Sequence, residues 1–245
     1  MIKLLSAGKT DVGLQRENNE DAFLHMPEPG LFALSDGMGG AAAGEIASRY
    51  FIETVESVFR ARQRSPGQDR KFIQEVFSLS SRRMREHAAC FPEEEGMGCT
   101  GDVLVWNGAE YIIGHIGDSR VYLLRDRVLR QLTTDHTLVQ LQLDKGMLTA
   151  AEARVHPRRN ILVRAIGADL AASCDILQNT AIHGDLFLLC SDGLTDMLND
   201  DIIQACLDSA RSIEDKTGSL VSAALAAGGR DNVTVVLCQV EGEAV

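Results

Sequence analysis

The stretch GDVLVWNGAEYIIGHIGDSRVYLLRDRVLRQL, residues 101–132, decides the fold class. It holds four apolar runs of strand length: Asp102–Trp106, Tyr111–Ile116, Val121–Leu124 and Val128–Leu132. Short polar turns separate the runs, and Asn107-Gly108 is the pair most typical of a tight β-hairpin. Strands joined by such short turns pair antiparallel, so this region predicts an antiparallel sheet and not a βαβ unit.

The residues before this stretch predict short strands followed by a helical hairpin. Leu31–Ser35 is a compact apolar run, which suits a buried strand. Glu45–Arg62 and Lys71–His87 both place apolar residues on a single helical face. The breaker Ser65-Pro66-Gly67-Gln68 separates them and favours an antiparallel pair.

The residues after it continue the same alternation of strand groups and helix pairs. The expected elements are a polar, helical excursion from His136 to about Arg159, strands at Ser173–Gln178 and Leu186–Cys190, helices at about Asp200–Ser209 and Ile213–Ala227, and a last strand at Asn232–Val240. Grouped strands with paired helices predict an α+β fold in which packed antiparallel sheets are flanked by helices. No stretch has the composition of a linker and no repeat is present, so we expect a single domain over residues 1–245.

Composition and charge exclude several classes of protein. The 24 basic and 35 acidic residues give a net charge of −11, which repels nucleic acid, and aromatic residues make up only 5%. The N-terminus lacks the apolar core of a signal peptide, and no run is long enough to span a membrane. None of the six cysteines forms a C-x-x-C pair, which argues against a zinc or redox site. We expect a cytoplasmic protein in which Cys190 and Cys238 are buried thiols.

Acidic residues stand where the apolar runs stop. Asp36, Asp118 and Asp192 each follow a strand-like run, and Asp231 precedes the last one. A single Asp-Gly is most often only a turn signal, because Asp and Gly favour turns for backbone reasons. Four such aspartates, with Glu20-Asp21 near a further strand end, would converge at one edge of a sandwich. Carboxylates crowded there would repel one another and would need a cation.

The ligand type indicates which cation is expected. All the candidate ligands are oxygens, a set that suits Mg²⁺ or Mn²⁺ and disfavours structural zinc. The spacing does not fit a calcium loop. Two such ions would activate a water and clamp a phosphoryl group. Arg16, four residues before Glu20, offers a planar fork for phosphate oxygens, although an isolated arginine is more often a surface residue.

Six motifs in order resemble the PP2C (PPM) family of metal-dependent protein serine/threonine phosphatases, in its compact bacterial form. They are Arg16-Glu17-Asn18-Asn19-Glu20-Asp21, Ser35-Asp36-Gly37-Met38-Gly39-Gly40, Gly117-Asp118-Ser119-Arg120, Thr134-Asp135-His136, Ser191-Asp192-Gly193-Leu194 and Arg230-Asp231-Asn232-Val233-Thr234. They run over nearly the whole chain. The resemblance implies a β-sandwich flanked on both sides by antiparallel helix pairs.

The resemblance also assigns roles to individual residues. It implies a phosphatase that attacks phosphoserine or phosphothreonine with a hydroxide bridging two Mn²⁺ or Mg²⁺ ions. The implied assignments are as follows: Asp36 bridges the ions, the Gly37 carbonyl binds one, Asp192 and Asp231 hold the second, Glu20 and Asp21 act through bound waters, Arg16 grips the phosphate, and Asp118 joins Asp192 at a third ion. Arg16, Asp36 and Asp192 form the implied catalytic set. The implied partners are phosphorylated proteins, the targets of a bacterial Ser/Thr kinase, with neither nucleic acid nor membrane.

Three further details follow from the same resemblance. Residues 138–167, which include His156-Pro157-Arg158-Arg159-Asn160, resemble the family's flap over the substrate site. Met38 stands where animal members carry a proton-donating His, so water is the expected donor, and Ala41 replaces another His found in many relatives. We interpret Thr134-Asp135-His136 as a cap that opens the next helix.

Two alternatives remain at this point. Gly37-Met38-Gly39-Gly40-Ala41-Ala42 fits the G-x-G-x-x-A dinucleotide fingerprint, but a lone fingerprint is a weak signal, and a second helix follows instead of a parallel strand. The chain could also be a degenerate phosphatase that only binds phosphoproteins. Such relatives typically lose metal aspartates, whereas all four are present here.

Overall fold

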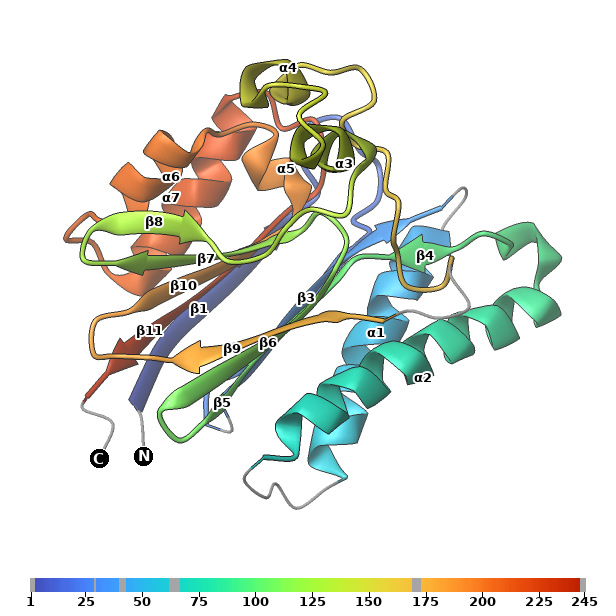
Figure 1. The fold of residues 1–245 in the computed structure, drawn as a ribbon, viewed down its shortest axis with the longest axis horizontal. Helices are drawn as coiled ribbons and strands as arrows, with labels where there is room; N and C mark the ends of the chain where they lie inside the picture. The colour runs from blue at the N-terminus through green and yellow to red at the C-terminus, as the bar shows by residue number, and fades with distance from the viewer. Residues whose placement is uncertain (1–2, 29, 40–42, 62–66, 169–172, 243–245) are drawn as a thin grey trace.

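Two antiparallel sheets form the centre of the molecule (Figure 1). The computed structural model describes residues 3–28, 30–39, 43–61, 67–168 and 173–242. The first sheet has the order β1 (Lys3–Asp11), β11 (Val233–Glu241), β10 (Leu186–Cys190), β7 (Arg120–Arg125), β8 (Val128–Gln131). The second has the order β2 (Asp21–Met26), β3 (Leu31–Met38), β5 (Gly101–Asn107), β6 (Glu110–Ile116), β9 (Asp175–Thr180), with β4 (Gly98–Cys99) paired to β3.

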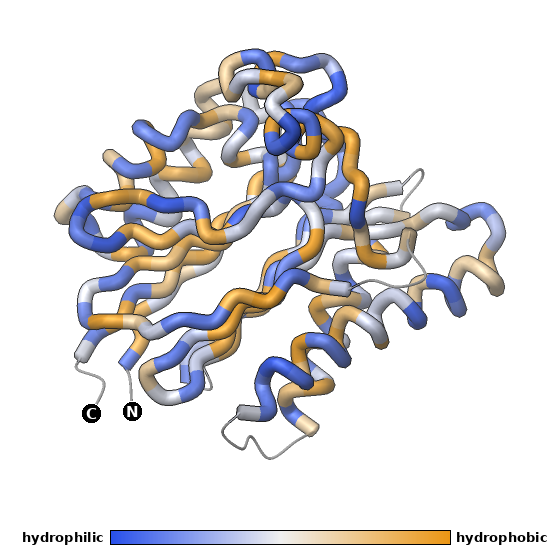
Figure 2. The backbone as a smooth tube through the Cα atoms, viewed as in Figure 1, coloured by the Kyte–Doolittle hydropathy of each residue, from blue (hydrophilic) through white to orange (hydrophobic). Residues whose placement is uncertain are grey.

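The two sheets enclose an apolar core between them. Phe187 of β10 is fully buried there, and its ring lies 5.2 Å from that of Trp106 and 4.8 Å from that of Tyr111. Figure 2 shows the hydrophobic residues concentrated along the paired strands and hydrophilic stretches on the outer turns of α2 (Asp69–Cys90). The packed core therefore fixes how the strand ends of the two sheets meet.

Helix pairs cover the outer faces of the sandwich (Figure 1). α1 (Ala43–Arg60) packs with α2 on the second sheet, where Phe51 and Phe77 meet edge to face with ring centres 5.2 Å apart. α6 (Asp200–Leu207) and α7 (Ile213–Ala226) cover the first sheet. The predicted α+β sandwich with flanking helix pairs is confirmed.

Residues 101–132 fold into the antiparallel strands that their sequence predicts. β5 and β6 pair antiparallel through Asn107↔Glu110, and Gly108 takes a positive φ of 63° in the turn between them. The dinucleotide reading is wrong, because the neighbours of β3 are antiparallel β2 and β5, and no parallel βαβ unit forms. Residues 40–42 of that fingerprint, the end of the predicted helix at Arg62, and Ser65-Pro66 of the breaker lie outside the described residues.

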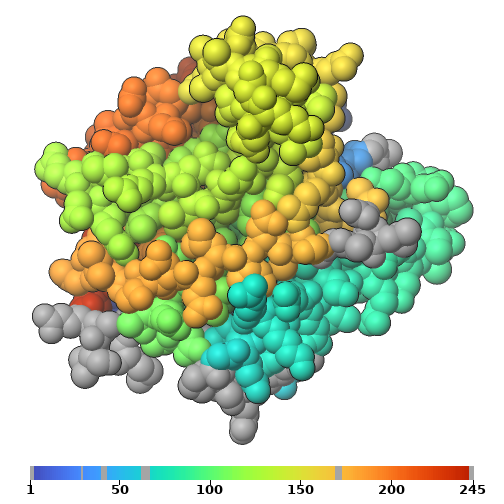
Figure 3. Space-filling view, in the orientation of Figure 1, coloured from blue at the N-terminus to red at the C-terminus, as the bar shows by residue number. Residues whose placement is uncertain are grey.

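The expected flap is a raised segment with little regular structure. It contains only α3 (Leu138–Asp144) and α4 (Ala150–Arg154), so the continuous helical excursion expected from His136 to Arg159 is broken into two short helices. Thr149 and Glu152 form a capping box at the start of α4. Figure 3 shows this segment (yellow) standing above the sheets.

Three short elements were not predicted: β4, the 3₁₀ turn η1 (Pro92–Glu94) and α5 (Asp192–Thr195). Cys190 and Cys238 are fully buried, as expected. Within the described residues, no helix is long and apolar enough to cross a bilayer.

Candidate metal and phosphate site

One cavity of about 430 Å³ gathers almost all the predicted site residues. Its lining includes Arg16, Glu20, Asp36, Gly37, Asp118, Asp192 and Asp231. These residues come from loops and strand ends of both sheets, as the convergence argument predicted. Asp21 lies beneath the cavity and is buried.

Asp36 and Asp192 lie at the centre of this group. Asp36 is directly opposite Asp21 in the β2–β3 register, and its backbone N–H donates to Thr100 Oγ1 at 2.9 Å. Asp192 follows β10 and begins α5. Burial, and then repulsion by neighbouring carboxylates, raises the pKa of both groups well above the ordinary value. Carboxylates held together in this way favour a proton or a cation between them.

Asp21 has one oxygen satisfied and one free. Its Oδ2 accepts hydrogen bonds from Ser191 Oγ at 2.7 Å and from Thr234 Oγ1 at 2.6 Å. Its Oδ1 is buried without a hydrogen-bond partner among the described residues. Burial raises the pKa of this carboxyl to about 6, against the opposing effect of the two hydroxyl donors. A buried lone carboxylate oxygen is costly unless a water or ion completes it.

Asp118 lies on the turn that leads from β6 into β7. Burial, followed by repulsion from Asp135, raises the pKa of Asp118 to about 7. Asp118 lines this cavity and also a second cavity beneath the flap. It therefore lies between the carboxylate group and the flap.

Arg16 supplies positive charge at the mouth of the cavity. Its Nη2 donates to Asp231 Oδ2 at 2.7 Å, and about half of the Arg16 side chain is exposed. The bond to Asp231 raises the pKa of the guanidinium further, so Arg16 stays charged. Arg16 therefore places a permanent positive charge, half of it exposed, at the edge of the carboxylate-lined cavity.

Asn232 also lines the cavity, although no role was predicted for it from the sequence. Its Oδ1 accepts from the Glu20 N–H at 2.8 Å, and its Nδ2 donates to the Val12 and Asn18 carbonyls at 2.9 Å each. It thereby ties the loop of Arg16 and Glu20 to the start of β11. Its position directly after Asp231 was the only available signal.

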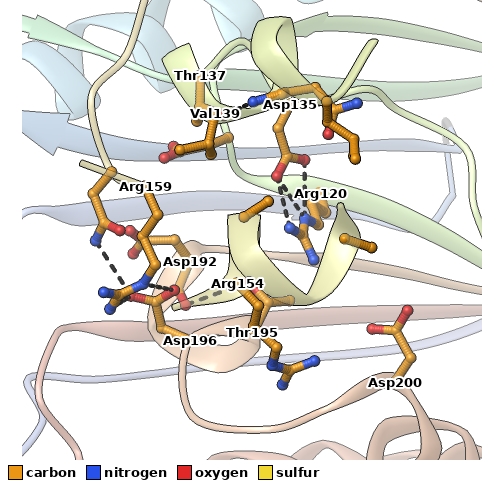
Figure 4. Close-up of a pocket in the computed structure, with 16 residues that line it drawn as sticks. Arg120, Asp135, Thr137, Val139, Arg154, Arg159, Asp192, Thr195, Asp196 and Asp200 are labelled. Atoms are coloured by element: carbon orange, nitrogen blue, oxygen red, sulfur yellow. Dashed lines mark hydrogen bonds and ion pairs between the residues drawn. The ribbon is translucent and has the colours of Figure 1, made fainter. Parts of the chain in front are cut away.

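The second cavity, of about 230 Å³, opens between the flap and the body (Figure 4). Ion pairs define its walls. Arg159 of the flap binds Asp196 at 2.8 Å, and Arg120 binds Asp135 at 2.6 Å. Asn160, also on the flap, lines both cavities and donates to Asp196. Asn160 of the flap therefore borders both cavities, and Arg159 beside it ties the flap to Asp196.

The interpretation of Thr134-Asp135-His136 as a helix cap is wrong. The N-cap of α3 is Thr137, whose side chain accepts from the Gln140 N–H. The three residues before it are bound elsewhere. The Thr134 carbonyl accepts from His115, Asp135 binds Arg120, and His136 holds Gly117.

The residues present fit divalent cations. The lone Oδ1 of Asp21, the raised pKa values of Asp36 and Asp192, and the purely oxygen donor set all favour a hard cation. Among the described residues, no group of three or more His, Cys, Asp or Glu side chains is close enough to hold a metal ion without other ligands. The expected ligand set is not limited to side chains, because it also draws on the Gly37 carbonyl and on water.

Comparison with known proteins agrees with this fold and donor set. Residues 14–227 match the sequence profile of a family described as "Protein phosphatase 2C". The serine/threonine protein phosphatase PstP of Mycobacterium tuberculosis is 38% identical over 241 residues, which are 98% of this chain and 45% of PstP. The serine/threonine phosphatase stp of Listeria monocytogenes is 34% identical, with 94% of each chain covered. The chain thus spans about half the length of PstP and nearly all of the Listeria protein.

Solved structures give the same result. A crystal structure of the Mycobacterium tuberculosis phosphatase PstP/Ppp superposes with a TM-score of 0.92 at 36% identity, covering 99% of this chain and 100% of that one. The catalytic domain of PstP in complex with two manganese ions superposes with a TM-score of 0.90 at 34% identity, covering 99% and 100%. From its sequence, its sandwich and its gathered carboxylates, the chain belongs to the protein phosphatase 2C family.

Proposed function

We propose that this chain is a metal-dependent phosphatase that hydrolyses phosphoserine and phosphothreonine in proteins. The observation that carries the proposal is the cavity in which Asp36, Asp192 and Asp231 face one another beside a single arginine, Arg16. Relatives named as serine/threonine phosphatases, at 34–38% identity, support the same reaction.

The acidic residues would hold Mn²⁺ or Mg²⁺. In this proposal Asp36 would contact both ions, the Gly37 carbonyl would bind one of them, Asp192 and Asp231 would hold the second, and Glu20 and Asp21 would act through water. Asp118 with Asp192 would hold a third. When bound, the ions supply an activated hydroxide and neutralise charge on the phosphoryl group.

Arg16 would orient the phosphate. Its planar fork matches two phosphoryl oxygens, and its contact with Asp231 brings it to the cavity edge. Met38 lines the cavity and has no proton to give, so the proton for the departing serine oxygen comes from water on the Asp118 side.

The substrate would be a folded or extended phosphoprotein that enters beside the flap. The second cavity supports this route, because it adjoins the first at Asp118 and Asp192 and is walled by flap residues. We propose that the substrates are targets of a Ser/Thr kinase. The reduced cysteines support action in the cytoplasm.

Hydrolysis of p-nitrophenyl phosphate and of a phosphoserine peptide, with added Mn²⁺, with Mg²⁺ and after exhaustive chelation by EDTA, tests the proposal. We expect turnover with metal and none after chelation, because all-oxygen sites hold such ions less tightly than thiolate or imidazole sites hold zinc. Full activity after chelation would overturn it. Tight binding of the phosphopeptide without turnover in saturating metal would indicate a phosphoprotein-binding module instead.

A further inference from the structure

We propose that His136 is a positioning residue that clamps the Gly117–Asp118 turn and connects it to the flap. The inference rests on the proposed function in one respect, since it takes Asp118 to be a metal ligand. His136 is not among the residues proposed to contact the metal ions or the phosphate, and its role is to hold Asp118 in place.

His136 satisfies both backbone groups of Gly117. The His136 N–H donates to the Gly117 carbonyl at 2.7 Å, and the Gly117 N–H donates to His136 Nδ1 at 3.0 Å. Gly117 has a φ of +117°, which L side chains rarely adopt, and a Cβ there would lie 2.5 Å from Thr100 Cγ2. Gly117 has no side chain to fix this conformation, whereas Ser119, on the other side of Asp118, is held by Thr100 at 2.7 Å between the hydroxyl oxygens. The contacts of His136 therefore hold the Gly117 side of the turn and help to set the direction in which Asp118 points.

The clamp needs His136 to be neutral, and the neighbouring groups keep it so. His115 stacks on it with ring centres 4.8 Å apart. His115 Nδ1 faces the Asp102 carboxylate at 2.8 Å and its Nε2 faces the Thr134 carbonyl at 3.0 Å, so both nitrogens donate and His115 is an imidazolium. Burial, and then the charges of His115 and Arg164, lower the pKa of His136 to about 4. Nδ1 is therefore free to accept from Gly117.

The other edge of the His136 ring contacts the base of the flap. Because Nδ1 accepts, the ring proton is on Nε2, which donates to Asp175 Oδ2 at 3.1 Å. Arg164 Nη1 donates to Asp175 Oδ1 at 2.9 Å and lies 2.7 Å from His136 Nε2, so the two donors converge on the Asp175 carboxylate. The His136 carbonyl accepts from the Val163 N–H at 2.8 Å. The returning end of the flap is thus joined to the turn of Asp118 through one residue.

A matched pair of substitutions tests the clamp. Asn places an acceptor close to the position of Nδ1, whereas Gln moves its acceptor one bond further away. We expect His136→Gln to weaken the weakest Mn²⁺ site and to lower kcat on the phosphoserine peptide by about 10–100-fold, the range typical when a partner of a ligand is lost. His136→Asn should retain both within about 3-fold, since an acceptor remains. Titration calorimetry with Mn²⁺ measures the sites without substrate.

The control is Arg125→Gln, which removes an ion pair to the buried Asp185 outside both cavities. It should lower the melting temperature and leave Mn²⁺ binding unchanged, which separates positioning from general destabilisation. Should His136→Gln fail to fold, Arg164→Gln frees the outer edge of the ring, and the same site should weaken in the same direction.

Two results would overturn the proposal. One is wild-type Mn²⁺ binding by His136→Gln, or by Arg164→Gln if His136→Gln does not fold and Arg164→Gln is used in its place. The other is equal loss in His136→Asn and His136→Gln. A wild-type protein that binds Mn²⁺ but hydrolyses no phosphoester would overturn the proposed function alone, and the calorimetric comparison would still decide the role of His136.

Discussion

At the scale of single residues, the candidate site combines carboxylates of raised pKa with one arginine. Asp36 and Asp192 owe their raised pKa first to burial and then to neighbouring aspartates, of which Asp21 has the largest effect on Asp36 and Asp118 the largest on Asp192. Arg16 pairs with Asp231 alone among the described acids. The acids are therefore suited to hold cations, and Arg16 is suited to bind the anion that those cations attract.

Replacing Arg16 with Ala should raise KM for a phosphopeptide by about 10-fold, equal to about 1.4 kcal/mol of lost charge-assisted binding. We expect a smaller fall in kcat, because the fork binds the phosphate of the ground state as well as that of the transition state. Steady-state kinetics with Arg16→Lys as the control checks this, since Lys keeps the charge without the fork. An unchanged KM with a strongly reduced kcat would instead indicate that Arg16 stabilises the transition state and not the bound substrate.

Replacing Asp118 with Asn keeps the shape of the turn residue but removes its charge. If Asp118 holds an ion that helps protonate the leaving group, kcat on a phosphoserine peptide should fall about 10²–10³-fold, or roughly 2.7–4 kcal/mol. The loss should be smaller on p-nitrophenyl phosphate, whose leaving group hardly needs a proton.

Asp36→Asn is the comparison for this variant, with near-complete loss expected on both substrates. Calorimetry should report about one Mn²⁺ site fewer in Asp118→Asn. Equal losses of Asp118→Asn on the two substrates would exclude the leaving-group role.

At the scale of elements, the strands with strong apolar runs were predictable and the weak ones were not. β5 and β6 are buried and their turn is explicit, so their bounds follow from the sequence. β1 is an edge strand whose residues are mostly half-exposed, so its sequence has no continuous apolar run. β4 and α5 contain only two and four residues, which is too short for any periodicity.

The site could be predicted only as far as local context allows. Asp36 and Asp192 stand beside glycine at strand ends, and that pattern is visible in the chain. The contacts of Asn232 with Glu20 and Asn18 join residues 212 and 214 positions apart, and nothing local announces them. The cap at Thr137 was misplaced by three residues because the groups of Thr134, Asp135 and His136 are taken by partners in β6 and β7 and by Gly117.

An ion pair between Arg159 and Asp196 ties the flap to the body of the protein. Arg159→Gln should remove its pair with Asp196 and loosen the flap, which should raise KM for a phosphoprotein about 3–10-fold. The melting temperature should hardly change, because partly exposed ion pairs contribute about 0–1 kcal/mol. Arg158→Gln, next in the chain and exposed, carries the same change of charge without that pair and serves as the control.

Limited proteolysis measures the loosening directly, with faster cleavage between residues 145 and 160 expected in Arg159→Gln. Identical cleavage and kinetics in Arg158→Gln and Arg159→Gln would mean that the ion pair does not hold the flap.

At the scale of the whole molecule, the gathered carboxylates oppose folding unless they are neutralised. The pKa of Asp118 is raised to about 7, and that of Asp36 and of Asp192 lies well above its ordinary value. The folded state therefore binds more protons than the unfolded state above pH 6.5, and its free energy of unfolding falls as pH rises. His136 acts in the opposite direction, but only below pH 6.5, where its lowered pKa matters.

We therefore expect the protein in EDTA to melt at a lower temperature at pH 8 than at pH 6.5, and added Mn²⁺ to remove most of the difference. Scanning calorimetry at the two pH values, with and without Mn²⁺, measures this. A metal-free protein that becomes more stable from pH 6.5 to pH 8 would contradict it.

The position of β11 has a consequence for how the chain is made. β11 lies between β1 and β10, and it leaves the ribosome after all the other strands. Until it arrives, β1 and β10 have no shared neighbour, and Asp231 and Asn232 are absent from the cavity. A nascent chain can therefore form its hairpins and helices early, but it cannot assemble the cavity before synthesis has passed β11.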